Sequence, residues 1–200
     1  MILIGQYDSP FVRRVGIALT LYNLPFRQEP WSVFGDADRI RPFNPLTRVP
    51  TLVLPDGDSL IDSHMILDHL DSLVPAALRL FPQTEPDRRR ALKRAALACG
   101  VGDKAVSLFY ELRLHEQTSA VFVDRCRRQI SEGLQVLEAA QTHGPDGHAE
   151  IAIACVWRFA TEAHPGLIAS ADFPQLSALS TRLEATAPFR TIFQPFVAPA

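Results

Sequence analysis

The fold of this chain is decided by residues 1–21, which read MILIGQYDSPFVRRVGIALTL. The apolar run at residues 2–4 predicts a short buried strand. Ser9 and Pro10 predict a helix start, because serine is a favoured N-cap and proline suits the first helical position. Apolar side chains then recur at helical spacing to the end of the stretch. A strand followed closely by a capped helix therefore opens the chain.

Strand and helix signals continue to about residue 77. They are, in chain order, a strand at 26–30, a loop with a short helix at 31–47, a strand at 51–54, a hairpin turn at 55–58, a returning strand at 59–61 and a helix capped by Asp62 and Ser63. The order β-α-β-(α)-β-β-α predicts a small mixed sheet with helices. Arg13 and Arg14, on the first helix, are expected on its solvent side.

The rest of the chain is predicted to be helical. Residues 78–87 contain two prolines and no periodic pattern, so we interpret them as a linker. The predicted helices lie at 88–115, 119–142, 149–163 and 175–186. The third is almost wholly apolar, which is typical of the central helix of a bundle.

The composition indicates a folded chain with no general attraction to nucleic acid or membrane. The 200 residues are 47% hydrophobic and 21% charged, with a formal net charge of −2. No stretch approaches the roughly 18 apolar residues of a membrane span. Cys99, Cys126 and Cys155 form neither an even framework nor a zinc-ligand pattern, so we expect buried, reduced thiols, no metal and a cytoplasmic location.

Ser9 is the first candidate for chemistry, since a helix N-terminus presents free N–H groups that favour an anion. In a thioredoxin-like domain this position would hold the first cysteine of C-x-x-C, but Ser9 and Val12 exclude dithiol redox chemistry. A serine hydroxyl can still donate to a bound thiolate, which is worth about 1.5–3 kcal/mol. That would lower a thiol pKa by about 1–2 units. The alternative is that Ser9 serves only as an N-cap.

Two further motifs flank later strands. Val49-Pro50 precedes the strand at 51–54, and a cis bond there would leave the Val49 N–H and C=O free to pair with an extended peptide ligand. At the next helix start, the Ser63 N–H and hydroxyl form an anion site of carboxylate size, and Asp62 could take an ammonium group. An ordinary strand-entry proline and plain helix capping are the alternatives.

The three motifs together resemble the glutathione S-transferase family, in particular bacterial members with serine before the first-helix proline. The resemblance covers the whole chain and is most specific in its first part. It is carried by YDSPFVRRV at 7–15, FNPLTRVPTL at 43–52 and LIDSHMIL at 60–67. It implies an α/β plus all-α fold: a thioredoxin-like N-terminal domain at 1–77, a linker at 78–87 and a helical-bundle C-terminal domain at 88–200.

The resemblance also implies a role for each motif. Ser9 would donate a hydrogen bond to the glutathione thiolate. Val49, next to a cis Pro50, would pair its backbone with the cysteinyl residue of glutathione. Asp62 and Ser63 would hold the γ-glutamyl ammonium and carboxylate. Tyr7 is not the catalytic residue, because Ser9 stands directly before the helix.

The resemblance implies a transferase that binds glutathione as a cosubstrate and transfers it to a small hydrophobic electrophile, as in detoxification. It also implies a homodimer and a reaction that needs no metal. The electrophile pocket is expected between the domains, lined by Ser9, Phe11 and the helix at 88–115. Asp103, Tyr110 and Arg113 are its polar candidates on that helix.

Two positions depart from the family pattern. Arg48 is expected to reach the glycyl carboxylate, but the family usually has glycine before this basic residue, where Thr47 stands. The central C-terminal helix usually begins with Ser/Thr-x-x-Asp, and here Gly147 and Glu150 occupy the two positions. Glu150 can replace the acid, yet the missing side-chain N-cap should cost about 1 kcal/mol of stability.

Two alternatives to glutathione conjugation remain open. The first is glutathione-dependent reduction of peroxides or mixed disulfides, which serine in place of cysteine at position 9 disfavours. The second is a non-catalytic glutathione- or ligand-binding or interaction protein on the same fold, since a fold alone does not fix a function.

Overall fold

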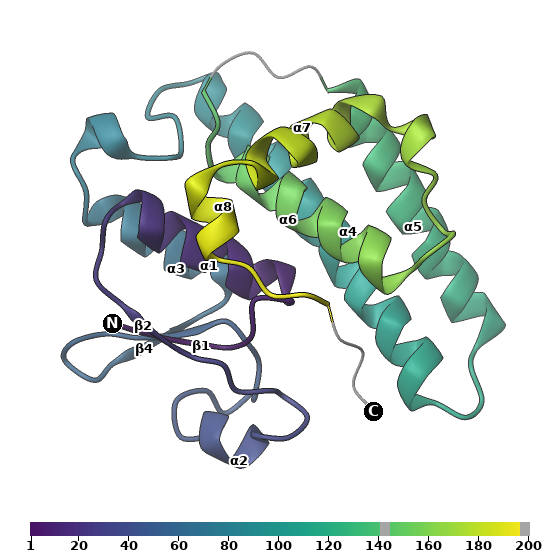
Figure 1. Cartoon of the computed structure of the whole chain (residues 1–200), viewed down its shortest axis with the longest axis horizontal. Helices are drawn as coiled ribbons and strands as arrows, with labels where there is room; N and C mark the ends of the chain where they lie inside the picture. The colour runs from purple at the N-terminus through teal and green to yellow at the C-terminus, as the bar shows by residue number, and fades with distance from the viewer. Residues whose placement is uncertain (141–144, 197–200) are drawn as a thin grey trace. The chain divides into compact units, whose positions relative to one another are not determined.

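A computed structural model describes residues 1–140 and 145–196, and its chain divides into two units (Figure 1). Unit 1 contains residues 1–83 together with the C-terminal segment that starts at Ala185, and unit 2 contains Thr84–Glu184. None of the described helices has both the length and the apolarity needed to cross a membrane.

Unit 1 is built on a four-stranded sheet with the strand order β2-β1-β3-β4. The strands are β1 (Ile2–Ile4), β2 (Arg27–Glu29), β3 (Thr51–Val53) and β4 (Ser59–Ile61). Strand β1 runs parallel to β2 and antiparallel to β3, and β3 runs antiparallel to β4. Two helices follow strands of this sheet, α1 (Pro10–Leu21) after β1 and α3 (Ser63–Ser72) after β4, and the short α2 (Ala37–Ile40) and η1 (Ala76–Leu78) complete the unit's N-terminal part. This is the thioredoxin-like topology that the sequence predicts.

Alternation along the strands gives the sheet two apolar faces. Leu3 and Leu52 are register partners and belong to a buried cluster with side chains of α1 and α3. Ile4 and Val53 point the other way and pack with Ile40 of α2. Figure 1 shows α1 and α3 together on one side of the sheet and α2 on the other. The hydrophobic runs therefore specify which face each helix covers.

The prediction that Arg13 and Arg14 face solvent is wrong. Their exposed fractions are 2% and 1%. Arg13 Nε donates to the carbonyl of Ile192 at 2.9 Å, and its Nη2 donates to the carbonyl of Phe189 at 3.1 Å. The guanidinium of Arg13 also lies over the Phe189 ring, 5.2 Å from its centroid. A charged side chain can be buried when such partners satisfy it, and these partners are far away in sequence.

The same contacts explain why the C-terminal segment belongs to unit 1. Helix α8 (Ala187–Thr191) packs on α1, and Phe189 and Ile192 are buried. The sequence analysis assigned residues 185–196 to the C-terminal domain, because no local signal separates them from the helices before them. The boundary along the chain between the two units falls between Gln83 and Thr84, inside the expected linker 78–87.

Unit 2 is helical, as expected. It contains α4 (Asp87–Leu114), α5 (Ala120–Ala139), α6 (His148–Ala163), η2 (Ser170–Asp172) and α7 (Pro174–Glu184). Helix α6 packs against both α4 and α7, and it is buried except at Arg158, Thr161 and Glu162. Its apolar sequence thus marks the centre of the unit. Residues 141 and 142, which the sequence analysis included in the helix at 119–142, lie outside the described residues.

Glu150 makes one of the two hydrogen bonds of a capping box at the start of α6. Its carboxylate accepts from the Gly147 N–H at 2.9 Å and from Arg94 on α4. Gly147 provides no side-chain cap in return, as predicted. The acidic residue of the expected capping pattern is therefore present, while the hydroxyl is missing.

Candidate functional site

Strand register in unit 1 brings the three predicted motifs to one edge of the sheet. Ile4, the last residue of β1, is paired with Thr51, the first residue of β3, and Thr51 is paired with Ile61, the last residue of β4. The loop that leads to Ser9, the Val49-Pro50 pair and the Asp62-Ser63 pair therefore all adjoin the same edge. Segments as far apart in sequence as residues 9 and 63 meet there.

Gly5 is the point at which the loop, α1 and Val49 approach most closely. Its φ is +129°, and a Cβ built on it would lie 2.6 Å from Val12 Cγ2 and 2.9 Å from Val49 Cβ. Both distances are too short for a side chain, and the backbone angle itself favours glycine. Gly5 thus allows the first turn of α1 and the segment before β3 to converge. Sequence analysis gave Gly5 no such role.

Ser9 is the N-cap of α1, as predicted. The N–H of Val12 donates to Ser9 Oγ over 3.4 Å, which is long for a hydrogen bond. Among the described residues, the Ser9 hydroxyl has no acceptor for its own proton, and the N–H of Phe11 has no acceptor either. The hydroxyl is half-buried and lies at the positive end of a 12-residue helix. This arrangement can bind an anion.

Val49 presents a free backbone edge. The Val49–Pro50 peptide bond is cis, as predicted. Separately, neither the N–H nor the C=O of Val49 has a hydrogen-bond partner in residues 1–140 and 145–196. Val49 is only partly buried, so both groups can pair with an extended peptide in the way that a strand edge does.

Asn44 fixes the loop before Val49, and sequence analysis gave it no role. This buried amide donates to the carbonyl of Arg48 at 2.8 Å and to Thr51 Oγ1 at 3.1 Å, and its oxygen accepts from the N–H of Leu46. An asparagine between a short helix and a proline is a turn signal that points to such bonding. Asn44 thereby determines where the backbone of Val49 is presented.

Thr47 adopts the left-handed conformation. Its φ is +50°, an unfavourable value for a β-branched residue. This backbone conformation therefore has an energetic cost. Arg48 follows as an exposed side chain that has no hydrogen-bond or ion-pair partner within the described part of the chain. It is available to an anionic ligand.

Asp62 and Ser63 begin α3. The carboxylate of Asp62 accepts from the N–H of His64 at 2.8 Å through Oδ1, and the side chain is exposed. Ser63 is buried, and its Oγ accepts from Nη1 of the buried Arg14 at 3.3 Å. Arg14 thus joins the start of α3 to α1 and places a cation beside Ser63. A ligand carboxylate would meet positive charge here and a ligand ammonium would meet Asp62.

Comparisons with known proteins identify the family. Residues 3–78 match the family model described as glutathione S-transferase, N-terminal domain. The chain is 33% identical over 161 residues to the uncharacterized GST-like protein YibF of Escherichia coli, covering 78% of this chain and 79% of that protein. The chain belongs to the glutathione S-transferase family.

Solved structures of the family agree with this assignment over the whole chain. A glutathione S-transferase from Methylobacterium radiotolerans, solved with glutathione sulfonate, has a TM-score of 0.90 and 29% identity, covering 100% of this chain and 98% of that one. A glutathione transferase family member from Pseudomonas fluorescens, solved with bound glutathione, has a TM-score of 0.85 and 30% identity, covering 98% and 99%.

The remaining residues that the family resemblance singled out lie in both units. Phe11 is on α1, half-buried, whereas Asp103, Tyr110 and Arg113 are on α4. The ring of Tyr110 lies 6.2 Å from that of Phe109, and the guanidinium of Arg113 lies 5.9 Å from the same ring. The structure thus groups Tyr110 and Arg113 around Phe109.

Tyr7 is held through its backbone, and its phenol shows no sign of activation. Its N–H donates to Gln194 Oε1 at 3.1 Å, so the C-terminal segment reaches the loop that carries Ser9. Burial raises the pKa of Tyr7, which opposes formation of a phenolate. Sequence analysis could not find Gln194, because this bond spans 187 residues.

Metal ligands and reactive thiols do not gather within residues 1–140 and 145–196. Among the described residues, no group of three or more His, Cys, Asp and Glu side chains is placed to hold a metal ion. All three cysteines are free and buried, and burial raises the pKa of Cys126. The unpaired polar groups at the sheet edge are therefore the strongest candidate for chemistry.

Proposed function

We propose that the protein binds glutathione at the sheet edge formed by Ser9, Val49 and Asp62-Ser63, and transfers its thiolate to small hydrophobic electrophiles. The observation that carries the proposal is the convergence of unpaired groups from three segments on one edge. They comprise the anion site at Ser9, the free backbone N–H and C=O of Val49, and the Asp62 carboxylate next to Ser63. Two of the similar solved structures contain glutathione or glutathione sulfonate, which supports glutathione as the ligand.

Each part of glutathione then has a partner. The cysteinyl backbone pairs with the N–H and C=O of Val49, which precedes Pro50. The γ-glutamyl ammonium binds the carboxylate of Asp62, and the γ-glutamyl carboxylate binds the N–H and hydroxyl of Ser63. Arg48, which is exposed and without an internal partner, binds the glycyl carboxylate. All four interactions involve charged groups or backbone groups, and such interactions fix the orientation of the bound glutathione.

Ser9 stabilises the nucleophile and does not itself react. Its hydroxyl donates to the glutathione sulfur, and the positive end of α1 adds to this stabilisation. A hydrogen bond to a charged group is worth about 1.5–3 kcal/mol, so the thiol pKa falls by about 1–2 units from about 8.5. The thiolate then attacks the electrophilic carbon. A carbon–sulfur bond forms, and either the leaving group departs with its electron pair or the adduct takes up a proton from water.

The electrophile is proposed to contact Phe11, Asp103, Tyr110 and Arg113. A homodimer in the cytoplasm, with a role in detoxification and with neither nucleic acid nor membrane as a partner, is the setting we propose. No metal is required in this mechanism, because the Ser9 hydroxyl and the positive end of α1 stabilise the thiolate. Reduction of peroxides or mixed disulfides is disfavoured, since position 9 carries a hydroxyl rather than a thiol.

Binding without turnover is the alternative function. It is favoured by one observation, namely that Ser9 Oγ already accepts the cap bond from Val12 and thus has a structural role. In that case the protein would bind glutathione or another ligand and would serve as a carrier or interaction protein.

The test is calorimetric titration with glutathione, using a matched pair of variants. Asp62→Asn removes the charge but keeps an oxygen for the His64 N–H, and asparagine tolerates the φ of +67° at this position. Asp56→Asn makes the same change in the exposed turn between β3 and β4, away from the proposed edge. We expect saturable binding that Asp62→Asn weakens about 10-fold and Asp56→Asn leaves unchanged. Absence of binding at millimolar glutathione, or equal effects of the two variants, would refute the proposed site.

A further inference from the structure

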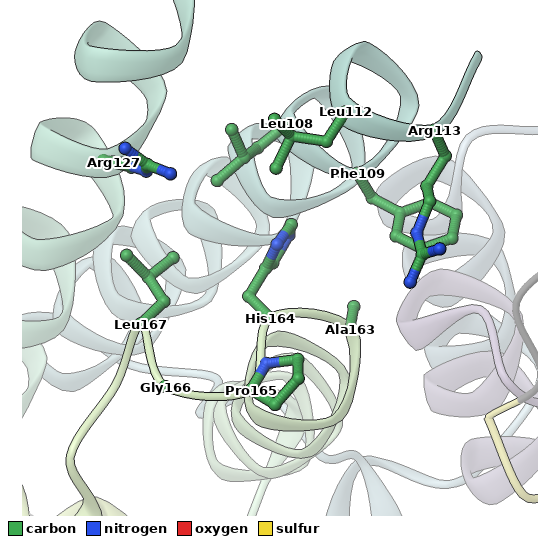
Figure 2. A pocket seen from close by; sticks show the side chains of 10 residues that line it. All are labelled: Leu108, Phe109, Leu112, Arg113, Arg127, Ala163, His164, Pro165, Gly166 and Leu167. Carbon is green, nitrogen blue, oxygen red and sulfur yellow. The ribbon is translucent and has the colours of Figure 1, made fainter.

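Unit 2 contains a cavity that the proposed glutathione site does not use. Its volume is about 530 Å³, within the range of small-molecule sites. It is lined by the last turns of α4, by α5, and by the end of α6 with the turn that follows (Figure 2). Every lining residue belongs to Thr84–Glu184, so the cavity is formed within one unit.

The charge of the lining is positive. Arg113 and Arg127 line the cavity, and none of the lining residues in the described chain is acidic. Arg127 forms one ion pair, with Asp124 at 3.9 Å, and both side chains are largely exposed, so this pair contributes little. Leucines of α4 and the turn after α6 supply the apolar walls. Such a lining suits an anion with an apolar body.

Besides positive charge and apolar walls, the cavity contains a buried histidine, His164. Its exposed fraction is 7%, and its Nε2 lies 2.8 Å from the carbonyl oxygen of Ala105. A carbonyl only accepts, so Nε2 carries the hydrogen and Nδ1 carries a lone pair. Burial is the main cause that lowers the pKa of His164, with the charge of Arg127 adding to it, and the ring is therefore neutral near pH 7. Nδ1 has no partner among the described residues.

Figure 2 shows the ring of His164 in the middle of the lining. In this view it stands between Arg127 and Leu167 on one side and Phe109 and Arg113 on the other. Its ring meets that of Phe109 edge to face, at 6.4 Å between centroids. A neutral acceptor is thus surrounded by aromatic and apolar surface, with a cation on each side.

We propose that this cavity binds an aromatic carboxylate that also carries a hydroxyl group. The aromatic ring packs against Phe109 and the leucines, as aromatic pairs do in edge-to-face contact. The carboxylate lies toward the arginines, and the hydroxyl donates to Nδ1 of His164. Arg113 is shared with the proposed electrophile contact. No residue of the sheet edge takes part, so this assignment does not depend on glutathione binding.

A matched set of three probes tests the proposal by calorimetry on the full protein, with glutathione present throughout. The probes are 3-(4-hydroxyphenyl)propanoate, 3-phenylpropanoate, which lacks the hydroxyl, and 3-(4-hydroxyphenyl)propanamide, which lacks the charge. We expect saturable binding of the first, about 5-fold weaker binding of the second and about 10-fold weaker binding of the third. No saturable binding of the first probe, or equal affinities for the three, would overturn the proposal.

A pair of arginine variants locates the site. Arg127→Gln removes the charge of a lining residue, and Arg128→Gln does the same at the next position of α5, which does not line the cavity. Both side chains are exposed, so both variants should fold. The first should weaken binding of the hydroxylated acid about 10-fold and leave the amide unaffected, whereas the second should change neither. Equal losses in both variants would place the ligand elsewhere and refute the assignment.

Discussion

The Ser9 hydroxyl has two roles, as the N-cap of α1 and as the proposed donor to the glutathione thiolate. Two substitutions that remove the hydroxyl differ only in how much they weaken the cap. Ser9→Ala and Ser9→Gly both abolish donation to a bound thiolate. Alanine at an N-cap costs about 0.5–2 kcal/mol of stability, whereas glycine costs only a few tenths. Because the Val12 N–H reaches Ser9 Oγ over a long 3.4 Å, we place the alanine variant at the lower end, about 0.5–1 kcal/mol.

The effect on glutathione should be the same in both variants. Loss of a hydrogen bond to a charged sulfur raises the thiol pKa by about 1–2 units, which reduces the thiolate fraction about 10- to 100-fold below that pKa. A thiolate of higher pKa is intrinsically more nucleophilic, with a Brønsted slope of about 0.4–0.5, so the rate falls less, roughly 3- to 15-fold. The pKa is read from the ultraviolet absorbance of bound thiolate, and the rate from conjugation to an activated chloroarene.

Ser119→Ala is the control for a lost cap. Ser119 is the N-cap of α5 and accepts from the Phe122 N–H at 3.4 Å, the same distance as at Ser9. It should lower stability in urea as much as Ser9→Ala and leave the thiol pKa unchanged. The reasoning is refuted if Ser9→Gly keeps the wild-type thiol pKa, or if activity follows the order of stability among the three variants.

Three further changes test the fold around the site and in unit 2. Thr47→Gly relieves a φ of +50° and should raise the free energy of unfolding by about 1 kcal/mol in urea; a lower value would mean that the loop is not strained. Tyr22→Phe removes the hydroxyl that donates to buried Asp71, and it should lower thermal stability by the equivalent of about 1–3 kcal/mol, whereas an unchanged melting temperature would show that the bond contributes nothing. Glu150→Gln leaves Arg94 without its carboxylate, and we expect a loss of about 2–3 kcal/mol in chemical unfolding, with a neutral result contradicting the pairing.

Local signals explain why the order of elements could be predicted. The Ser9-Pro10 helix start and the turn at 55–58 depend on residues next to one another, so their meaning does not require the rest of the fold. The register that aligns Ile4, Thr51 and Ile61 also follows from the hydrophobic pattern, because each strand must present its apolar residues to the correct face. This alignment makes the three motifs neighbours.

Features with distant partners could not be predicted. Helical spacing places Arg13 and Arg14 beside apolar positions, but their hydrogen-bond acceptors include groups of Ser63, Phe189 and Ile192. Nothing in those segments signals such bonding. For the same reason the packing of the C-terminal segment on α1 could not be predicted.

Features of backbone geometry could be predicted from the sequence only in part. Thr47 stood out because a glycine was expected, and the structure gives it a positive φ. By contrast, the role of Gly5 depends on how closely Val12 and Val49 approach, which no sequence pattern records. Asn44 belonged to a recognised motif, yet its bonds to Arg48 and Thr51 became visible only with the loop in three dimensions.

A crystal structure of the protein with glutathione tests the central claim most directly. The account predicts the glutathione sulfur within hydrogen-bond distance of Ser9 Oγ, the cysteinyl backbone paired with both the N–H and the C=O of Val49, and the γ-glutamyl end against Asp62 and Ser63. Glutathione bound at any other surface, or bound at this edge with its sulfur turned away from Ser9, would contradict it.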